Sequence, residues 1–277
     1  MNELSYLQAI ILGLVQGLTE FLPVSSSGHL ALGAHWFDLQ PESQSMLIFD
    51  IAVHLGTVLA VTMVFARKFI AYFTRLIAET NPKFEGRRIA WKIAALGIVA
   101  SIPTAIIGLT FKDQLEQAFG NRLGIGIALI GTGSLLWITG KIPRPKRGWR
   151  RFGWGRAFVI GLGQGIAILP GVSRSGTTIS LAILCGIKRQ WAGEFSFFIA
   201  IPAICGAALL QIKDVINDPA MSLSGFMTGP LLMGALVATA TGYFALRLLM
   251  SAVRNAKLHY FCYYCWMLGI IVIVAMR

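Results

Sequence analysis

Two polar stretches inside apolar sequence determine how this chain folds: Glu20-Phe21-Leu22-Pro23-Val24-Ser25-Ser26-Ser27-Gly28-His29 and Pro170-Gly171-Val172-Ser173-Arg174-Ser175-Gly176-Thr177-Thr178. We call them the first and second polar segments. Each lies within a longer apolar stretch, about residues 6–35 and 155–187. Proline and glycine interrupt helices, and an interrupted helix is tolerated at membrane depth only where protein or a wet cavity surrounds it. We therefore expect two helix–loop–helix pairs that enter a membrane and turn back.

The composition excludes a soluble protein. Of the 277 residues, 56% are hydrophobic and 13% are charged, whereas a soluble domain carries about 25% charged residues. A disordered chain, a collagen, a coiled coil and a secreted disulfide scaffold are excluded in the same way. The net charge of +12 does not indicate a nucleic-acid partner, because cytoplasmic loops of membrane proteins are rich in Lys and Arg. We expect a bilayer partner and no nucleic acid.

Six further stretches are candidate membrane spans, each near the required length of about 20 residues: 49–66, 90–110, 123–140, 192–212, 226–250 and 259–276. With the N-terminus outside, 19 of the 24 Lys and Arg residues fall on the cytoplasmic side, and the five exceptions are Lys112, Arg122, Arg174, Lys213 and Arg277. The positive-inside rule favours this topology. We predict an all-α integral membrane protein with six transmembrane helices, two re-entrant pairs and both termini extracytoplasmic.

The chain also contains an internal repeat. A shift of 148 positions aligns residues 13–29 with 161–177, and eight of these 17 positions are identical without a gap. We predict a single membrane domain, 1–277, with repeat halves 1–145 and 146–277. Because each half has three crossings, the second half is inserted upside down. Inverted repeats bring their broken helices together near the bilayer midplane, around a binding site.

The polar segments carry groups that suit phosphate chemistry. Arg174 is a bidentate phosphate donor that keeps its charge, and each segment should begin a helix, whose N-terminus favours anions. Ser26 is the candidate nucleophile, with His29 to activate it. In the alternative reading, His29 caps a helix, Glu20 and Arg174 form a structural ion pair, and the serines only pack. We favour function, because charge buried in a bilayer is costly.

Two polar residues of the span 49–66 receive lesser roles. We expect His54 to make a structural hydrogen bond, and Asp50 either to face the outer mouth of the site or to serve structure alone. Neither enters the proposed chemistry.

The segments resemble those of the bacterial undecaprenyl-diphosphate phosphatases associated with bacitracin resistance. Residues 16–29 resemble the first family motif, in which Glu or Gln, three residues and Glu lead into Ser-Gly-His. Residues 170–178 resemble the second motif, PGxSRSxxT, and Glu194-Phe195-Ser196-Phe197 resembles a further family segment. The resemblance covers nearly the whole chain.

This resemblance implies hydrolysis of undecaprenyl diphosphate to undecaprenyl phosphate and phosphate, which recycles the lipid carrier for cell-wall synthesis. It also implies a divalent cation, Mg²⁺ or Ca²⁺, and an inverted-repeat protein of the bacterial inner membrane whose site faces the extracytoplasmic side. A homodimer is compatible with it.

By position, the resemblance makes Glu20, Ser26, His29 and Arg174 catalytic, with Glu20 also a cation ligand. The expected substrate-binding residues are Gln16, Ser25, Ser27, Ser173, Ser175 and Thr178. Some members carry Glu where this chain has Gln16, which cannot act as a base and is expected to bind phosphate or water. The sequence leaves two nucleophiles open: Ser26, or water activated by Glu20 or His29.

Two rival functions remain at this stage. A transporter that flips a lipid phosphate or moves a small anion suits an inverted repeat. A different lipid phosphatase superfamily carries KxxxxxxRP, PSGH and SRxxxxxHxxxD motifs, but here no His follows Arg174 until His259.

Overall fold

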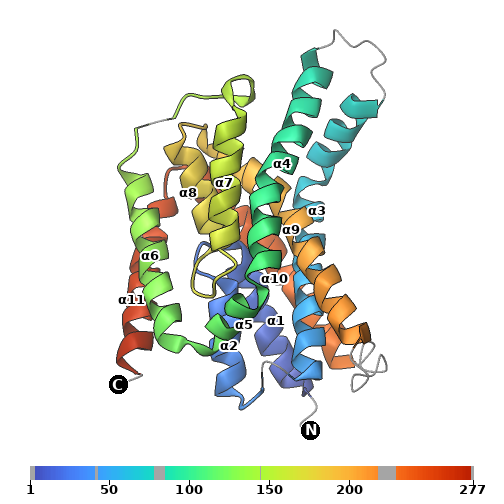
Figure 1. Cartoon of the computed structure of the whole chain (residues 1–277), viewed down its shortest axis with the longest axis vertical. Coiled ribbons are helices and arrows are strands. Elements are labelled where there is room, and N and C mark those ends of the chain that lie inside the picture. The colour runs from blue at the N-terminus through green and yellow to red at the C-terminus, as the bar shows by residue number, and fades with distance from the viewer. Residues whose placement is uncertain (1–3, 41–42, 78–84, 144, 218–228, 276–277) are drawn as a thin grey trace.

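The computed structural model describes residues 4–40, 43–77, 85–143, 145–217 and 229–275, and this part of the chain is helical (Figure 1). The α-helices are α1 (Tyr6–Phe21), α2 (Ser26–Trp36), α3 (Gln44–Ile77), α4 (Glu85–Thr110), α5 (Lys112–Gly120), α6 (Arg122–Gly140), α7 (Trp154–Ile166), α8 (Arg174–Leu184), α9 (Arg189–Asn217), α10 (Gly229–Arg254) and α11 (Phe261–Val274). Two short 3₁₀ turns, η1 (Trp149–Arg151) and η3 (Leu258–Tyr260), precede α7 and α11. The predicted all-α class is confirmed.

Five of the described helices are long and apolar enough to cross a bilayer: α3, α4, α6, α9 and α10. They coincide with five of the six predicted spans. The sixth, predicted at 259–276, corresponds to the shorter apolar stretch Leu258–Val274. Many large apolar side chains of the outer helices are exposed, including Leu236, Phe244 and Ile106, as expected for surfaces that face lipid. The protein is an integral membrane protein.

Both predicted helix breaks are present. The first apolar stretch divides into α1 and α2, and the second into α7 and α8. Ser26 and Arg174, which are related by the 148-residue shift, are the first residues of α2 and α8, so each polar segment begins a helix as expected. Ser25 and Ser173 occupy the equivalent cap positions, where their hydroxyls accept hydrogen bonds from the backbone N–H groups of Gly28 and Gly176.

The second break requires a glycine. Gly171 has a φ of +90°, and a Cβ atom there would lie 2.5 Å from the carbonyl oxygen of Ile125. An L-residue would be strained in this conformation and would also clash with α6. The turn between α7 and α8 can therefore lie directly against the α6 backbone.

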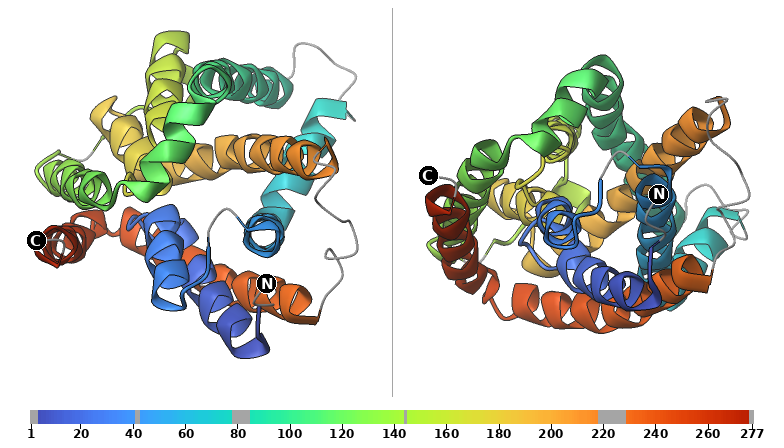
Figure 2. Two further views of the ribbon diagram at one scale, coloured as in Figure 1. Left: turned by 60° about the horizontal axis from the view of Figure 1, so that its bottom comes forward. Right: turned by 90° about the horizontal axis from the view of Figure 1, so that it is seen from below.

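The two helix pairs enter the bundle from opposite ends, and their turns meet near its middle (Figure 1). Both termini lie at one end of the bundle, whereas α6 connects to α7 at the other end. Figure 2 shows α1 lying along α10, and α7 lies along α4. Each broken element of one half therefore packs on a long helix of the other half.

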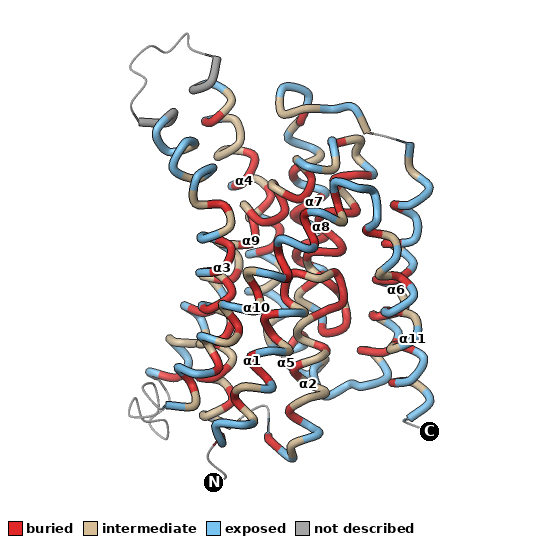
Figure 3. The backbone as a smooth tube through the Cα atoms, turned by 180° about the vertical axis from the view of Figure 1, so that it is seen from behind, coloured by how far each residue is buried: buried red, intermediate tan, exposed pale blue. Residues whose placement is uncertain are grey.

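The buried residues concentrate where these helices meet, and the outer faces of α6 and α11 are exposed (Figure 3). Phe21 of α1 and Phe197 of α9 are fully buried in this core and meet edge to face, with ring centroids 5.8 Å apart. The polar segments are thus surrounded by protein, which is the condition under which irregular backbone is tolerated at membrane depth.

Close helix packing leads to a first prediction. A Cβ atom at Gly161 of α7 would lie 2.0 Å from the carbonyl oxygen of Ala100 on α4, whereas one at Gly131 of α6 would meet nothing within 4 Å. We expect Gly161→Ala to destabilise the protein by about 1–3 kcal/mol through overpacking. Thermal unfolding in detergent measures this effect. Gly131→Ala is the control and should unfold at or above the wild-type temperature; equal stability of the two variants would contradict the packing.

Candidate active site

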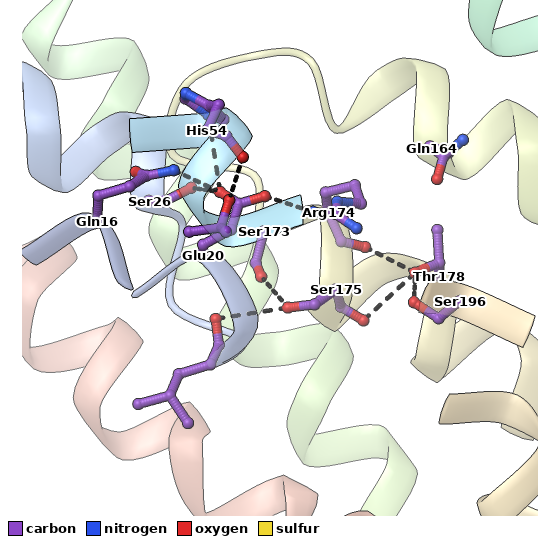
Figure 4. Close-up of polar contacts among 12 residues, drawn as sticks. Gln16, Glu20, Ser26, His54, Gln164, Ser173, Arg174, Ser175, Thr178 and Ser196 are labelled. Atoms are coloured by element: carbon purple, nitrogen blue, oxygen red, sulfur yellow. Dashed lines mark hydrogen bonds and ion pairs between the residues drawn. The ribbon is translucent and has the colours of Figure 1, made fainter. Parts of the chain in front are cut away.

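A buried ion pair joins the two polar segments. Glu20, on the last turn of α1, and Arg174, the first residue of α8, have side chains that are 5% and 15% exposed. The guanidinium Nη2 of Arg174 donates a hydrogen bond to Oε1 of Glu20 (Figure 4). A carboxylate from one half of the chain thus meets a guanidinium from the other, as the sequence predicted for two facing segments.

The second oxygen of Glu20 holds two further side chains. Ser26, the first residue of α2, donates its hydroxyl hydrogen to Oε2 of Glu20 at 2.6 Å. Gln16, one turn earlier on α1, donates from Nε2 to the same oxygen at 3.1 Å. A hydroxyl this close to a carboxylate has a base in place to take its proton when it attacks an electrophile.

Two atoms at this site are buried without a hydrogen-bond partner among the described residues, namely Nη1 of Arg174 and Oε1 of Gln16. A buried polar atom without a partner costs about 1–3 kcal/mol, so such atoms indicate a missing partner. The free Nη1 of Arg174 can donate a hydrogen bond to an anionic oxygen. The N-termini of α2 and α8 both lie at this site, and their helix dipoles favour negative charge there.

Ser25 fastens the two turns together. Its hydroxyl accepts from the backbone N–H of Gly171 at 3.0 Å as well as from that of Gly28, and its own φ is +68°. Ser27 lies beside it, with the two hydroxyl oxygens 3.4 Å apart. Of the predicted substrate-binding serines in the first segment, Ser25 is therefore already engaged in holding the backbone of the second.

The hydroxyls of the second segment are likewise engaged in protein contacts. Ser173 caps α8, and Ser175 donates to the carbonyl oxygen of Leu22 at 3.4 Å. Thr178 donates to the carbonyl oxygen of Arg174 at 2.9 Å, and its hydroxyl also contacts that of Ser196 on α9. These contacts hold Arg174 and its helix in position; binding of substrate by these hydroxyls stays a prediction.

His29 lies away from the ion pair. Its Nδ1 is 2.7 Å from the carbonyl oxygen of Ser25, and its Nε2 is 2.7 Å from the hydroxyl oxygen of Tyr264 on α11. No hydrogen bond joins His29 to Ser26 or Glu20 among the described contacts. The side chain that accepts the hydroxyl hydrogen of Ser26 is Glu20.

A different histidine faces the site. Nε2 of His54, on α3, lies 3.8 Å from Oε2 of Glu20, and its Nδ1 lies 3.3 Å from Oδ1 of Asp50 (Figure 4 includes His54). The sequence assigned His54 a structural hydrogen bond and did not place it here. The available signal was the four-residue spacing of Asp50 and His54, which puts both on one face of a helix.

The carboxylate of Glu20 would suit a cation that the phosphate groups of a substrate also coordinate. No group of three or more His, Cys, Asp and Glu side chains could hold a metal ion among the described residues. Mg²⁺ is commonly held by one or two carboxylates together with substrate phosphates, and Glu20 is the carboxylate at this site. A cation therefore fits only where phosphate oxygens supply much of its coordination.

Comparison with known proteins agrees with the phosphate chemistry that the side chains of this site suggest. Residues 9–271 match the family described as bacitracin resistance protein BacA. The chain is 40% identical to the undecaprenyl-diphosphatase of Carboxydothermus hydrogenoformans, over 96% of each chain. It is 42% identical to the undecaprenyl-diphosphatase of Alkaliphilus metalliredigens, over 96% of this chain and 97% of that one. The protein of the same name from Methanobrevibacter smithii is 35% identical, over 96% of each chain.

The buried ion pair yields a second prediction. Glu20→Ala leaves the guanidinium of Arg174 buried without its carboxylate, and breaking a buried pair costs about 3–5 kcal/mol. Thermal unfolding in detergent should show this loss. The matched control is Asp214→Ala, which breaks the exposed pair with Lys112 (side chains 53% and 44% exposed) and should change stability by at most about 1 kcal/mol. Equal losses in the two variants would show that the Glu20 pair is not a buried one.

Proposed function

This chain belongs to the bacitracin resistance protein BacA family, and we propose that it hydrolyses undecaprenyl diphosphate to undecaprenyl phosphate and inorganic phosphate. Hydrolysis recycles the lipid carrier for cell-wall synthesis. The observation that carries the proposal is the contact of Ser26 and Arg174 with one buried carboxylate. It combines a nucleophile, a base and a phosphate-binding cation at one point.

Substrate binding follows from the free donor on Arg174. In the unliganded protein the guanidinium pairs with Glu20 through one nitrogen, and its other terminal nitrogen has no partner among the described residues. A terminal phosphate oxygen supplies that partner and adds a charge-assisted hydrogen bond. The N-terminal ends of α2 and α8 stabilise the same negative charge. The isoprenoid tail stays in the bilayer.

The first chemical step is attack by Ser26. As the Ser26 oxygen forms a bond to the terminal phosphorus, its proton moves to Oε2 of Glu20, 2.6 Å away. The bond between that phosphorus and the bridging oxygen breaks, and undecaprenyl phosphate leaves with the electron pair. Arg174 stabilises the charge on the transferred phosphoryl group, which is the main requirement of such a transfer.

In the second step water attacks the phosphorylated Ser26. The proton held by Glu20 returns to the serine oxygen as the phosphorus–oxygen bond breaks, and the oxygen and both hydrogens of the water leave as part of inorganic phosphate, H₂PO₄⁻. Direct attack by water, with Glu20 or His29 as the base, is the alternative. Both ring nitrogens of His29 are engaged, Nδ1 with the carbonyl oxygen of Ser25 and Nε2 with the hydroxyl of Tyr264, so its predicted catalytic role requires the ring to leave these contacts.

A divalent cation, Mg²⁺ or Ca²⁺, belongs to the proposal. Glu20 would hold it together with phosphate oxygens, and a bound cation would supply further neutralisation of the diphosphate charge. Gln16 would hydrogen-bond phosphate or water through its free Oε1.

The orientation and the repeat are proposals with structural support. Opposite entry of the two helix pairs (Figure 1), together with the packing of α1 on α10 and α7 on α4, favours an inverted repeat with two re-entrant pairs. The basic loops favour extracytoplasmic termini and a site open to that side. A homodimer is a further proposal, which the mass of the detergent-solubilised protein tests.

The decisive experiment measures phosphate release from a C55 isoprenoid diphosphate by detergent-purified protein, with and without chelator. Release without a membrane gradient supports the phosphatase over a lipid-phosphate or anion transporter. Substrate that stays intact would overturn the phosphatase. Loss of release with chelator, restored by Mg²⁺ or Ca²⁺, supports the cation.

A third prediction concerns Arg174. Arg174→Ala should lower kcat/KM by at least about 1000-fold, because charge stabilisation of the phosphoryl group supplies most of such catalysis. Arg174→Lys keeps the charge but loses the planar pair of donors. Its kcat/KM should lie between the values for wild type and Arg174→Ala. The matched control is Arg122→Ala, on α6, whose guanidinium contacts His35. Wild-type activity in Arg174→Ala would remove the phosphate assignment.

A fourth prediction identifies the nucleophile. Rapid acid quenching with substrate labelled in the terminal phosphate should trap label on Ser26, found by peptide mass spectrometry. Ser26→Ala should trap none and release no phosphate above background. Ser27→Ala is the neighbouring control and should keep the label on Ser26. Full activity of Ser26→Ala would instead favour direct attack by water.

A further inference from the structure

A polar chain on α3 reaches the carboxylate oxygen of Glu20 that Arg174 does not contact. His54 presents Nε2 to Oε2 of Glu20 at 3.8 Å. Behind it, Asp50 holds Nδ1 of the ring through its carbonyl oxygen at 2.8 Å and its carboxylate at 3.3 Å. Gln211 of α9 donates to the other carboxylate oxygen of Asp50 at 3.3 Å. The chain of contacts therefore runs from α9 through α3 to the carboxylate of α1.

These contacts fix how the imidazole is presented. Both neighbours of Nδ1 are acceptor oxygens of Asp50, so Nδ1 carries a hydrogen and the ring cannot turn over without losing both contacts. Nε2 is then directed at Glu20. The side chains of His54 and Asp50 are 24% and 33% exposed, so this arrangement is held by contacts rather than by close packing alone.

Glu20 needs such a neighbour during the reaction that we propose. Arg174 holds Oε1, and Ser26 and Gln16 both donate to Oε2. When Arg174 also binds phosphate and Ser26 turns toward phosphorus, Glu20 shares one partner and loses another. Gln16 and His54 are then the side chains that stay beside Oε2, and His54 is the one that can carry a charge. Contacts that are long in an unliganded site often tighten when substrate binds.

From this geometry we infer that His54 and Asp50 are positioning residues, which hold the Glu20 carboxylate in the orientation that accepts the Ser26 proton. Asp50 orients the ring through its Nδ1–H, and in the imidazolium form, which donates from both nitrogens, the Nε2–H directed at Glu20 keeps Oε2 beside Ser26. The inference rests on the proposed function. It concerns the placement of the base and assigns neither residue a contact with substrate.

The test compares three histidine variants for kcat and KM with the C55 diphosphate. His54→Leu removes the ring nitrogens and should lower kcat by about 10- to 100-fold, the range that corresponds to one hydrogen bond to a charged group, with KM little changed. His54→Gln restores an N–H donor and should recover much of that loss. His35→Gln is the matched control, because the His35 side chain contacts only Arg122 among the described polar contacts, and it should behave as wild type.

Asp50 should act through His54. Asp50→Asn should lower kcat in the same direction, and adding it to His54→Leu should cause no further loss. A purely structural role predicts the reverse: parallel losses of folded protein, additive effects and no recovery with Gln. Wild-type kcat in His54→Leu, or equal kcat in His54→Gln and His54→Leu, overturns the inference.

A measurement independent of turnover separates this inference from the proposed function. Melting temperatures of wild type, Glu20→Gln, His54→Leu and the double variant form a double-mutant cycle, which isolates the coupling of the two side chains. The double variant should show a shift smaller than the sum of the single shifts. Additive shifts overturn the contact even if phosphate is released, whereas a coupled cycle without phosphate release rejects only the proposed function.

Discussion

The buried pairing of Glu20 with Arg174 is the contact on which the rest of this structure depends. Two charged side chains inside an apolar bundle are stable only when each compensates the other and their remaining hydrogen-bonding atoms are satisfied. Ser26 and Gln16 do this for the carboxylate. One guanidinium nitrogen has no partner among the described residues. The pair therefore serves stability, and in the proposed function the same guanidinium also binds phosphate.

The fold places these two charges together by breaking two helices. α1 and α7 each end where a polar segment turns the chain, and α2 and α8 begin with Ser26 and Arg174. The turns meet because the pairs enter from opposite ends and each lies on a long helix of the other half. Glycines such as Gly161 allow that approach, so helix packing outside the site sets the distances inside it.

Histidine shows where reasoning from the sequence reached its limit. His29 lies in a polar segment and His54 in an ordinary apolar span, and the polar segments did supply Glu20, Ser26 and Arg174, which the structure brings into contact. The position of a residue in a polar segment did not predict where its side chain points. His29 lies three residues after Ser26 on α2, yet its ring nitrogens contact the carbonyl oxygen of Ser25 and the hydroxyl of Tyr264. His54 comes to Glu20 from a separate helix.

The sequence by itself determined the membrane class, the helix breaks and the residue types at the site, because composition, proline, glycine and a repeat are local properties of the chain. The tertiary structure alone decided which of those residues touch. Glu20 and Arg174 are 154 positions apart. Helical periodicity relates residues within one helix, so it cannot predict a contact between helices from different halves of the chain. Their contact, the turning of His29 toward α11 and the arrival of His54 all depend on how separate helices cross, which is set by packing between distant faces.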